Sequence, residues 1–163
     1  MFTPRWQQGR RNQLEAAQQL YLESTEVAQQ HHHDLLRFAN FWGQGWVAYR
    51  RGEYAQAVSF YQQALRYFVQ VYALDWVVKT LGALALTQSA LGKHHSAVRF
   101  FACARALQDS THQQKILDPD MQQIAAAQTA LRAQLPPLTF DLHWQRGWHW
   151  TLEHVLAAAL DLG

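Results

Sequence analysis

Nine histidines and one cysteine are the residues of this sequence whose chemistry could support a metal site or a nucleophile. Three of the histidines, His31, His32 and His33, are consecutive. Neighbouring residues of a helix point about 100° apart, so this run does not make a preformed site. Zinc requires three or four converging ligands, and neither Cys-x-x-Cys nor His-Glu-x-x-His occurs. We therefore expect a solvated histidine run and no bound metal.

The sequence also lacks the motifs of catalysis and cofactor binding. No base is placed near Cys103 by its spacing, so we expect a buried and inert thiol. Gly43-x-Gly45 lies in a helical pattern and lacks the Gly-Lys-Ser/Thr of a phosphate loop, which predicts a role in close helix packing. Paired carboxylates, a serine elbow and a dinucleotide fingerprint are all missing. We expect a non-enzymatic protein without a cofactor.

Three aromatic residues are the clearest candidates for recognition of a partner. Trp42, Trp46 and Tyr49 are spaced i, i+4 and i+7, which places them on one face of a helix. With Arg50 and Lys79 beside it, this face could hold an amphipathic helix or an extended peptide. The alternative is that a missing neighbouring helix, or the chain's own C-terminal helices, cover the aromatic residues as part of the core.

The elements that carry these residues are expected to be helices. Ala, Leu and Gln make up 66 of the 163 residues, whereas the β-branched residues that suit a sheet number only 19. A net charge of +2, with dispersed charges, predicts no nucleic-acid partner. No apolar run approaches the roughly 18 residues of a membrane span. One cysteine fits a reducing compartment, so we expect a cytoplasmic all-α protein.

The chain repeats itself at a constant spacing. The segment at 51–58, RGEYAQAV, aligns with LGKHHSAV at 91–98. Small residues recur at the same spacing at positions 17, 57 and 97, and aromatic residues recur at 21, 61 and 101. Gly52 and Gly92 fall where a helix should end in a residue with positive φ. Each repeat is predicted to be a helical hairpin that buries its apolar face only by stacking on its neighbours.

This pattern predicts the boundaries of the helices. The repeats are expected to contain helices at 13–30, 34–50, 54–73, 75–91 and 95–109. After them we expect a helix from the Asp118-Pro119 cap to Gln134, a short helix from Thr139 to Arg146 that ends at Gly147, and a last helix capped by Thr151. The whole chain, 1–163, is expected to form one domain, with repeat hairpins at 13–110 and a C-terminal helical cap at 111–163.

The repeat resembles the tetratricopeptide family. The residues that carry the resemblance are Gly45, Gly52, Tyr54, Ala57, Tyr61, Ala64 and Leu65 in one copy, and Ala85, Gly92, Ala97, Phe101 and Ala104 in the next. The spacing exceeds that family's usual period of about 34 residues and overlaps that of HEAT and armadillo repeats, which stay open as alternatives. The resemblance implies a solenoid of hairpins with a concave groove. The residues expected to line it are Trp42, Trp46, Tyr49, Arg50, Lys79 and Leu86.

The last third resembles the C-terminal end of bacterial ATPase-type transcriptional regulators with tetratricopeptide sensor regions. The residues that carry this resemblance are Phe140, Trp144, Gly147, Thr151 and Glu153, followed by an Ala/Leu-rich end. Two features depart from that pattern, namely Leu135-Pro136-Pro137 and Arg146. The resemblance implies a sensor or interaction segment in bacterial signalling or transcriptional regulation.

Together these observations predict a non-catalytic module that binds a protein or peptide. A small-ligand sensor that uses the concave aromatic face is the alternative. The first helix has no preceding partner helix, so we expect its apolar face to be exposed and to form a homodimer. The residues of that face are Leu14, Ala17, Leu20 and Tyr21.

Overall fold

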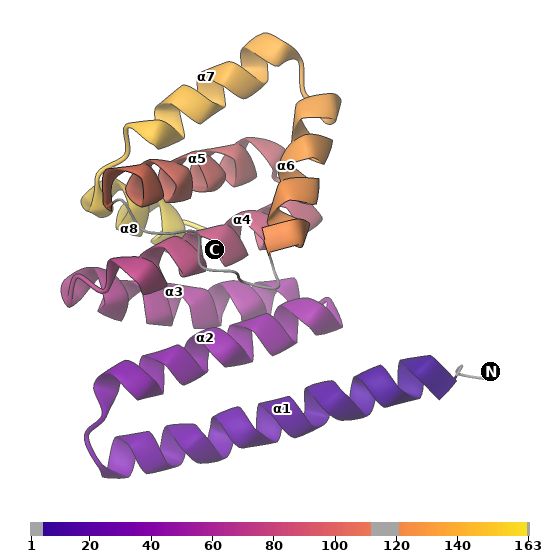
Figure 1. Cartoon of the computed structure of the whole chain (residues 1–163), viewed down its shortest axis with the longest axis vertical. Helices are drawn as coiled ribbons and strands as arrows, with labels where there is room; N and C mark the ends of the chain where they lie inside the picture. The colour runs from indigo at the N-terminus through magenta and orange to yellow at the C-terminus, as the bar shows by residue number, and fades with distance from the viewer. Residues whose placement is uncertain (1–4, 112–120, 163) are drawn as a thin grey trace. The chain divides into compact units, whose positions relative to one another are not determined.

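The structure, a computed structural model, describes residues 5–111 and 121–162. These two ranges contain α-helices and no strand, as expected from a composition rich in Ala, Leu and Gln (Figure 1). The helices are α1 (Arg5–Gln30), α2 (Asp34–Arg51), α3 (Tyr54–Gln70), α4 (Leu74–Ala90), α5 (His94–Thr111), α6 (Met121–Gln134), α7 (Pro137–Trp148) and α8 (Leu152–Leu160). Over these ranges, no helix combines the length and the apolar content that crossing a membrane would require.

The helices group into two compact units, and the boundary between the units falls within α3. The first unit extends to residue 64 and contains α1, α2 and the beginning of α3. In it, α1 packs along α2, and a side chain at Gly43 would collide with the ring of Tyr21. A Cβ at Gly45 would lie 2.7 Å from the ring of Tyr61. Both glycines therefore permit close helix packing, which confirms the interpretation of Gly43-x-Gly45.

Polar side chains join α1 to α2 within the first unit. The amide of Asn40 donates to the Ser24 hydroxyl at 2.8 Å. The guanidinium of Arg51, at the end of α2, donates to the side-chain oxygen of Gln18. Two side-chain hydrogen bonds at different points therefore hold α1 and α2 together.

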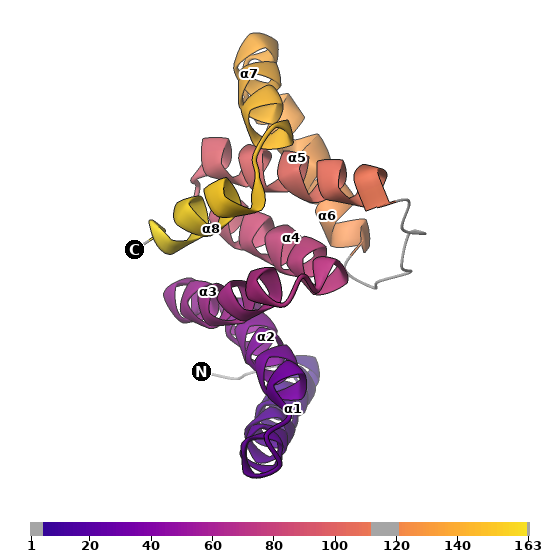
Figure 2. The same ribbon diagram turned by 90° about the vertical axis from the view of Figure 1, so that its left-hand side faces the viewer.

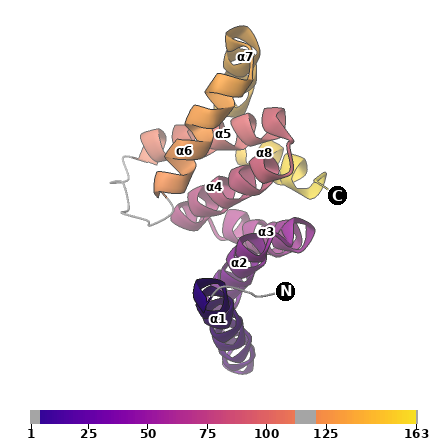
Figure 3. The ribbon, with the colours of Figure 1, turned by 90° about the vertical axis from the view of Figure 1, so that its right-hand side faces the viewer.

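The second unit, from residue 65 onward, is built around α5. This helix contacts both α4 and α7 (Figure 2), and α6 contacts α4, α5 and α7 (Figure 3). Gly147 of α7 lies directly against the backbone of Arg99 in α5, where an added Cβ would be 2.6 Å from the Arg99 Cα. Large apolar side chains fill the core of this unit. They include Phe68, Leu81, Leu84, Phe100, Phe101 and Leu131, each no more than 2% exposed.

Within the described residues, four turns that each contain one residue in the left-handed conformation follow one another at equal spacing. These residues are His32 (φ 56°), Gly52 (φ 79°), Tyr72 (φ 55°) and Gly92 (φ 73°). At each turn the following N–H bonds to the carbonyl five residues earlier, as in Glu53 to Ala48 at 2.9 Å. This is the Schellman arrangement, which satisfies carbonyls at a helix end. The repeat seen in the sequence thus consists of two equal parts, each made of one helix and the turn that follows it. The positive φ expected at Gly52 and Gly92 is confirmed.

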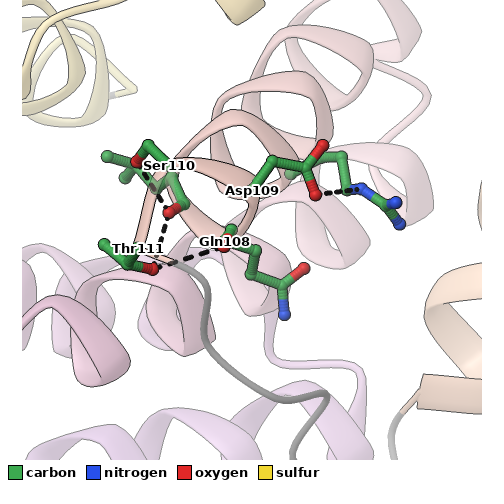
Figure 4. Close-up of polar contacts among 6 residues, drawn as sticks. Gln108, Asp109, Ser110 and Thr111 are labelled. Atoms are coloured by element: carbon green, nitrogen blue, oxygen red, sulfur yellow. Dashed lines mark hydrogen bonds and ion pairs between the residues drawn. The ribbon is translucent and has the colours of Figure 1, made fainter.

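The structure corrects several of the predicted boundaries. Helix α1 begins at Arg5 instead of residue 13, and α3 ends at Gln70 instead of residue 73. Helix α5 continues to Thr111, beyond its expected end at residue 109. There the hydroxyls of Ser110 and Thr111 donate to the Leu107 carbonyl at 2.9 and 2.8 Å (Figure 4). Both hydroxyls thus bond back to the backbone of the last helical turn.

The C-terminal helices also differ from the prediction. The expected short helix is present as α7, but it begins at Pro137 instead of Thr139, because the fixed φ and missing N–H of Pro137 suit a first helical position, and it ends at Trp148 instead of Arg146. Gly147 lies inside α7 and does not end it. The cap at Thr151 is confirmed, since its hydroxyl accepts from the His154 N–H at 3.3 Å. The expected Asp118-Pro119 cap lies outside the described residues.

Candidate functional site

The three aromatic residues of α2 lie in different environments. Trp42 is buried, with 9% of its surface exposed, and its ring lies 6.2 Å from that of Tyr61. Trp46 is half-buried, and the Arg50 guanidinium lies 5.2 Å from its ring centre. Tyr49 is also half-buried and packs against another tyrosine of α3 at 5.8 Å. Trp46, Tyr49 and Arg50 therefore reach the surface of the first unit, whereas Trp42 is in its core.

The other two predicted groove residues belong to α4 in the second unit. The Lys79 ammonium lies 5.5 Å from the centre of the Trp76 ring, which stacks on Phe68 at 5.2 Å. Lys79 is half-buried, while Leu86 is only 8% exposed. The second unit thus repeats the pairing of a cation with a tryptophan that Arg50 and Trp46 form in the first.

The residues predicted for self-association lie on both sides of α1. Leu14, Ala17 and Tyr21 are half-buried, and Tyr21 packs over Gly43 of α2. Leu20 is 65% exposed. Further apolar residues that the sequence did not single out are also exposed in this region. They are Leu22, Val27, Leu35 and Leu36.

A cluster of basic side chains joins α5 to α7. The Arg99 Nε donates a hydrogen bond to the His143 Nδ1 at 3.0 Å, and the rings of His95 and His143 stack with centres 4.2 Å apart. Burial lowers the pKa of His143, and the positive charges of Arg99, His95 and Arg146 lower it further. The pKa of Arg99 is lowered by burial and by Arg146. His143 is therefore kept neutral, with its proton on Nε2.

The sequence contained a weak signal for this cluster. The histidines and Arg146 are visible in it, but His95 and His143 are far apart along the chain and come together only because α5 packs on α7. The consecutive histidines at 31–33 are exposed, as expected. Among residues 5–111 and 121–162, no group of three or more His, Cys, Asp or Glu side chains is arranged to hold a metal ion.

The single cysteine lies in the core of the second unit. Cys103 is 1% exposed, which confirms its predicted burial. Burial raises the pKa of its thiol to about 12. Since the thiolate is the nucleophilic form, this residue is not equipped for nucleophilic catalysis at neutral pH.

Comparison with known proteins agrees with the repeat. Residues 37–110 match the family model of the tetratricopeptide repeat, which distinguishes this repeat from the HEAT and armadillo alternatives. No curated protein and no solved structure matches the chain. The match and the helical hairpins confirm the predicted all-α, tetratricopeptide-like class. Tetratricopeptide repeats generally mediate protein–protein interactions and are typically non-catalytic scaffolds.

Proposed function

We propose that this protein binds a protein or peptide partner through the surface of α2 around Trp46, Tyr49 and Arg50. The observation that carries the proposal is the half-buried Trp46 ring with the Arg50 guanidinium 5.2 Å from its centre. Tryptophan, tyrosine and arginine are the residues that most often dominate the binding energy of interfaces. Contact with Arg50 restricts the ring before binding, which reduces the entropy lost when a partner orders it.

The pair of Lys79 and Trp76 in the second unit supports the same function. The half-buried Trp76 ring is held by its stacking on Phe68, and the Lys79 ammonium lies 5.5 Å from its centre. Cations near tryptophan rings combine an apolar contact area with a charge that can pair with an acidic group of a partner. Trp42 and Leu86 are buried, so we assign them to the core and not to partner contact.

We further propose a role as an interaction or sensor segment in bacterial signalling or transcriptional regulation, within the cytoplasm. The support for this is the resemblance of the C-terminal end to such regulators, together with the Thr151 cap and the α8 helix that follows it.

We also propose that the protein forms a homodimer through α1, because Leu20 and neighbouring apolar residues are exposed on this helix. Sedimentation should show a dimer for the wild type and a monomer for Leu20→Glu. A clean monomer of the wild type at high concentration would remove this proposal.

The interaction is tested by affinity purification followed by quantitative mass spectrometry. The baits are the wild type, Trp46→Ala, Arg50→Ala and the control Leu138→Ala, whose leucine is 85% exposed on α7. We expect one set of proteins to be captured by the wild type and by Leu138→Ala but not by Trp46→Ala or Arg50→Ala. With a purified partner, Trp46→Ala should cost about 2 kcal/mol or more, roughly a thirtyfold loss of affinity.

Stability measurements separate loss of binding from loss of fold. Trp46→Ala should lower the free energy of unfolding by less than Trp42→Ala and leave the protein folded, whereas Trp42→Ala should lower it by about 3–5 kcal/mol because it empties the core. The proposal fails if Trp46→Ala and Arg50→Ala capture the same proteins as Leu138→Ala. A metabolite that stabilises the wild type but not Trp46→Ala would instead support a small-ligand sensor.

A further inference from the structure

The cluster of His95, Arg99, His143 and Arg146 concentrates basic groups where α5 packs on α7. His95 and Arg146 are exposed, Arg99 is half-buried, and His143 is 7% exposed. The cluster therefore begins at the surface and ends at a buried imidazole. Arg146 precedes Gly147, which lies directly against the backbone of Arg99, and the charge of Arg146 adds to burial in lowering the pKa of Arg99.

No acidic side chain neutralises this charge in the described part of the chain. Neither Arg99 nor Arg146 has a carboxylate of a described residue within 4.0 Å. On the same helix, Arg105 behaves differently, because its Nε lies 3.0 Å from a carboxylate oxygen of Asp109 (Figure 4). An arginine of α5 can thus be paired locally, and Arg99 is not.

The hydrogen bond to His143 leaves the outer edge of Arg99 available. Arg99 uses Nε to reach the Nδ1 of the neutral imidazole, and in the described structure no hydrogen bond engages its two terminal nitrogens. A guanidinium binds phosphate or carboxylate oxygens through such paired N–H groups. His143 therefore acts as a positioning residue that fixes the plane of the guanidinium.

We propose that His95, Arg99 and Arg146 form a binding site for an oxyanion, either the phosphate or the carboxylate group of a ligand. An oxyanion in contact with both guanidinium groups would offset their mutual repulsion, and His95 would add a hydrogen bond from its exposed ring. This site lies entirely in the second unit and is independent of the α2 surface proposed for partner binding.

Calorimetric titration and thermal unfolding test this site with inorganic phosphate. Sodium phosphate and sodium acetate are each compared with sodium chloride at the same ionic strength. We expect saturable phosphate binding and a higher melting temperature than in chloride. Acetate binding in addition would identify a carboxylate as an acceptable ligand, whereas binding of phosphate alone would identify a phosphate site. Equal melting temperatures in all three salts would overturn the proposal.

Matched variants distinguish the site from general charge effects. Arg146→Gln and His95→Gln remove exposed members of the cluster, and Arg105→Gln removes an equal charge elsewhere on α5. Binding should weaken at least tenfold in Arg146→Gln, weaken in His95→Gln, and stay unchanged in Arg105→Gln. An equal loss in Arg146→Gln and Arg105→Gln would refute a specific site.

The pKa of His143 can be measured with and without phosphate, and it would not change if the basic cluster had only a structural role. The groups that act on it are His95 and Arg99 from α5 and Arg146 from its own helix. From α6, Arg132 faces the neighbouring Phe140 ring at 4.3 Å. Bound phosphate adds negative charge beside these cations, so the pKa of His143, followed by NMR, should rise. An unchanged pKa at saturating phosphate would contradict the proposal.

Discussion

Replacing Tyr72 with glycine should stabilise the protein, although it deletes a large aromatic side chain. Tyr72 has a φ of 55° and is 74% exposed, so its side chain contributes little packing while its backbone adopts an unfavourable conformation. Left-handed φ costs a residue with a side chain about 1–2 kcal/mol. Glycine avoids this cost but loses about 0.5–1 kcal/mol more entropy on folding. The net gain should be about 0.5–1 kcal/mol, or roughly 2 °C in melting temperature.

Two further substitutions at the same position separate backbone from side chain. Tyr72→Ala removes the ring and keeps the strain, while Tyr72→Asn introduces a residue that tolerates this conformation better. In urea unfolding, Tyr72→Gly should be the most stable of the three variants, Tyr72→Asn the next and Tyr72→Ala the least stable. The slope of the free energy of unfolding against urea concentration should be the same for all three. At the equivalent turn, Gly52→Ala should lose about 1 kcal/mol. If Tyr72→Gly is no more stable than Tyr72→Ala, the argument from backbone strain is refuted.

Three other predictions concern the second unit. Gly147→Ala should destabilise the protein by about 1–3 kcal/mol, because the new Cβ would force the backbone of α5 away. Gly82→Ala is the control and should cost much less, because its Cβ would meet only a flexible side-chain end at 3.1 Å. Equal losses of stability in urea unfolding would argue against the close contact at Gly147. Cys103 should react with a thiol reagent at neutral pH only when the protein unfolds, and rapid labelling of the native state would contradict its burial. His143 has a lowered pKa, so the unfolded state binds more protons, and stability should fall as the pH drops below about 6.5. In urea unfolding measured at several pH values, the free energy of unfolding of His143→Gln should depend less on pH than that of the wild type. An unaltered pH dependence would exclude His143 as its source.

The repeat and its glycine turns could be predicted from the sequence because both have local signatures. Gly52 and Gly92 mark two of the four left-handed turns, and recurring small and aromatic positions mark the spacing of the repeat. The turns at His32 and Tyr72 have no such signature, because neither position holds a glycine, the residue type that marks a left-handed turn in a sequence. The shorter period, from each left-handed turn to the next, is therefore revealed only by the backbone φ angles of the structure.

Long-range packing explains the features that the sequence did not predict. Gly147 looked like a helix stop because glycine often follows a helix end, whereas in the structure it lets α7 approach the backbone of Arg99. The spacing of Trp42 and Trp46 placed both on one helical face but could not show how far each lies from the core. The basic cluster depends on the pairing of α5 with α7, which no local pattern encodes.

The equal spacing of the left-handed turns determines how this chain could be lengthened. A copy of residues 53–92 inserted after Gly92 would begin just after one left-handed glycine and end at another, so every helix would keep its phase relative to the next turn. An insertion of one residue within a helix would instead rotate all following side chains by about 100° and turn apolar residues toward water. Residues 53–92 therefore form a repeat unit that could be duplicated to build longer arrays.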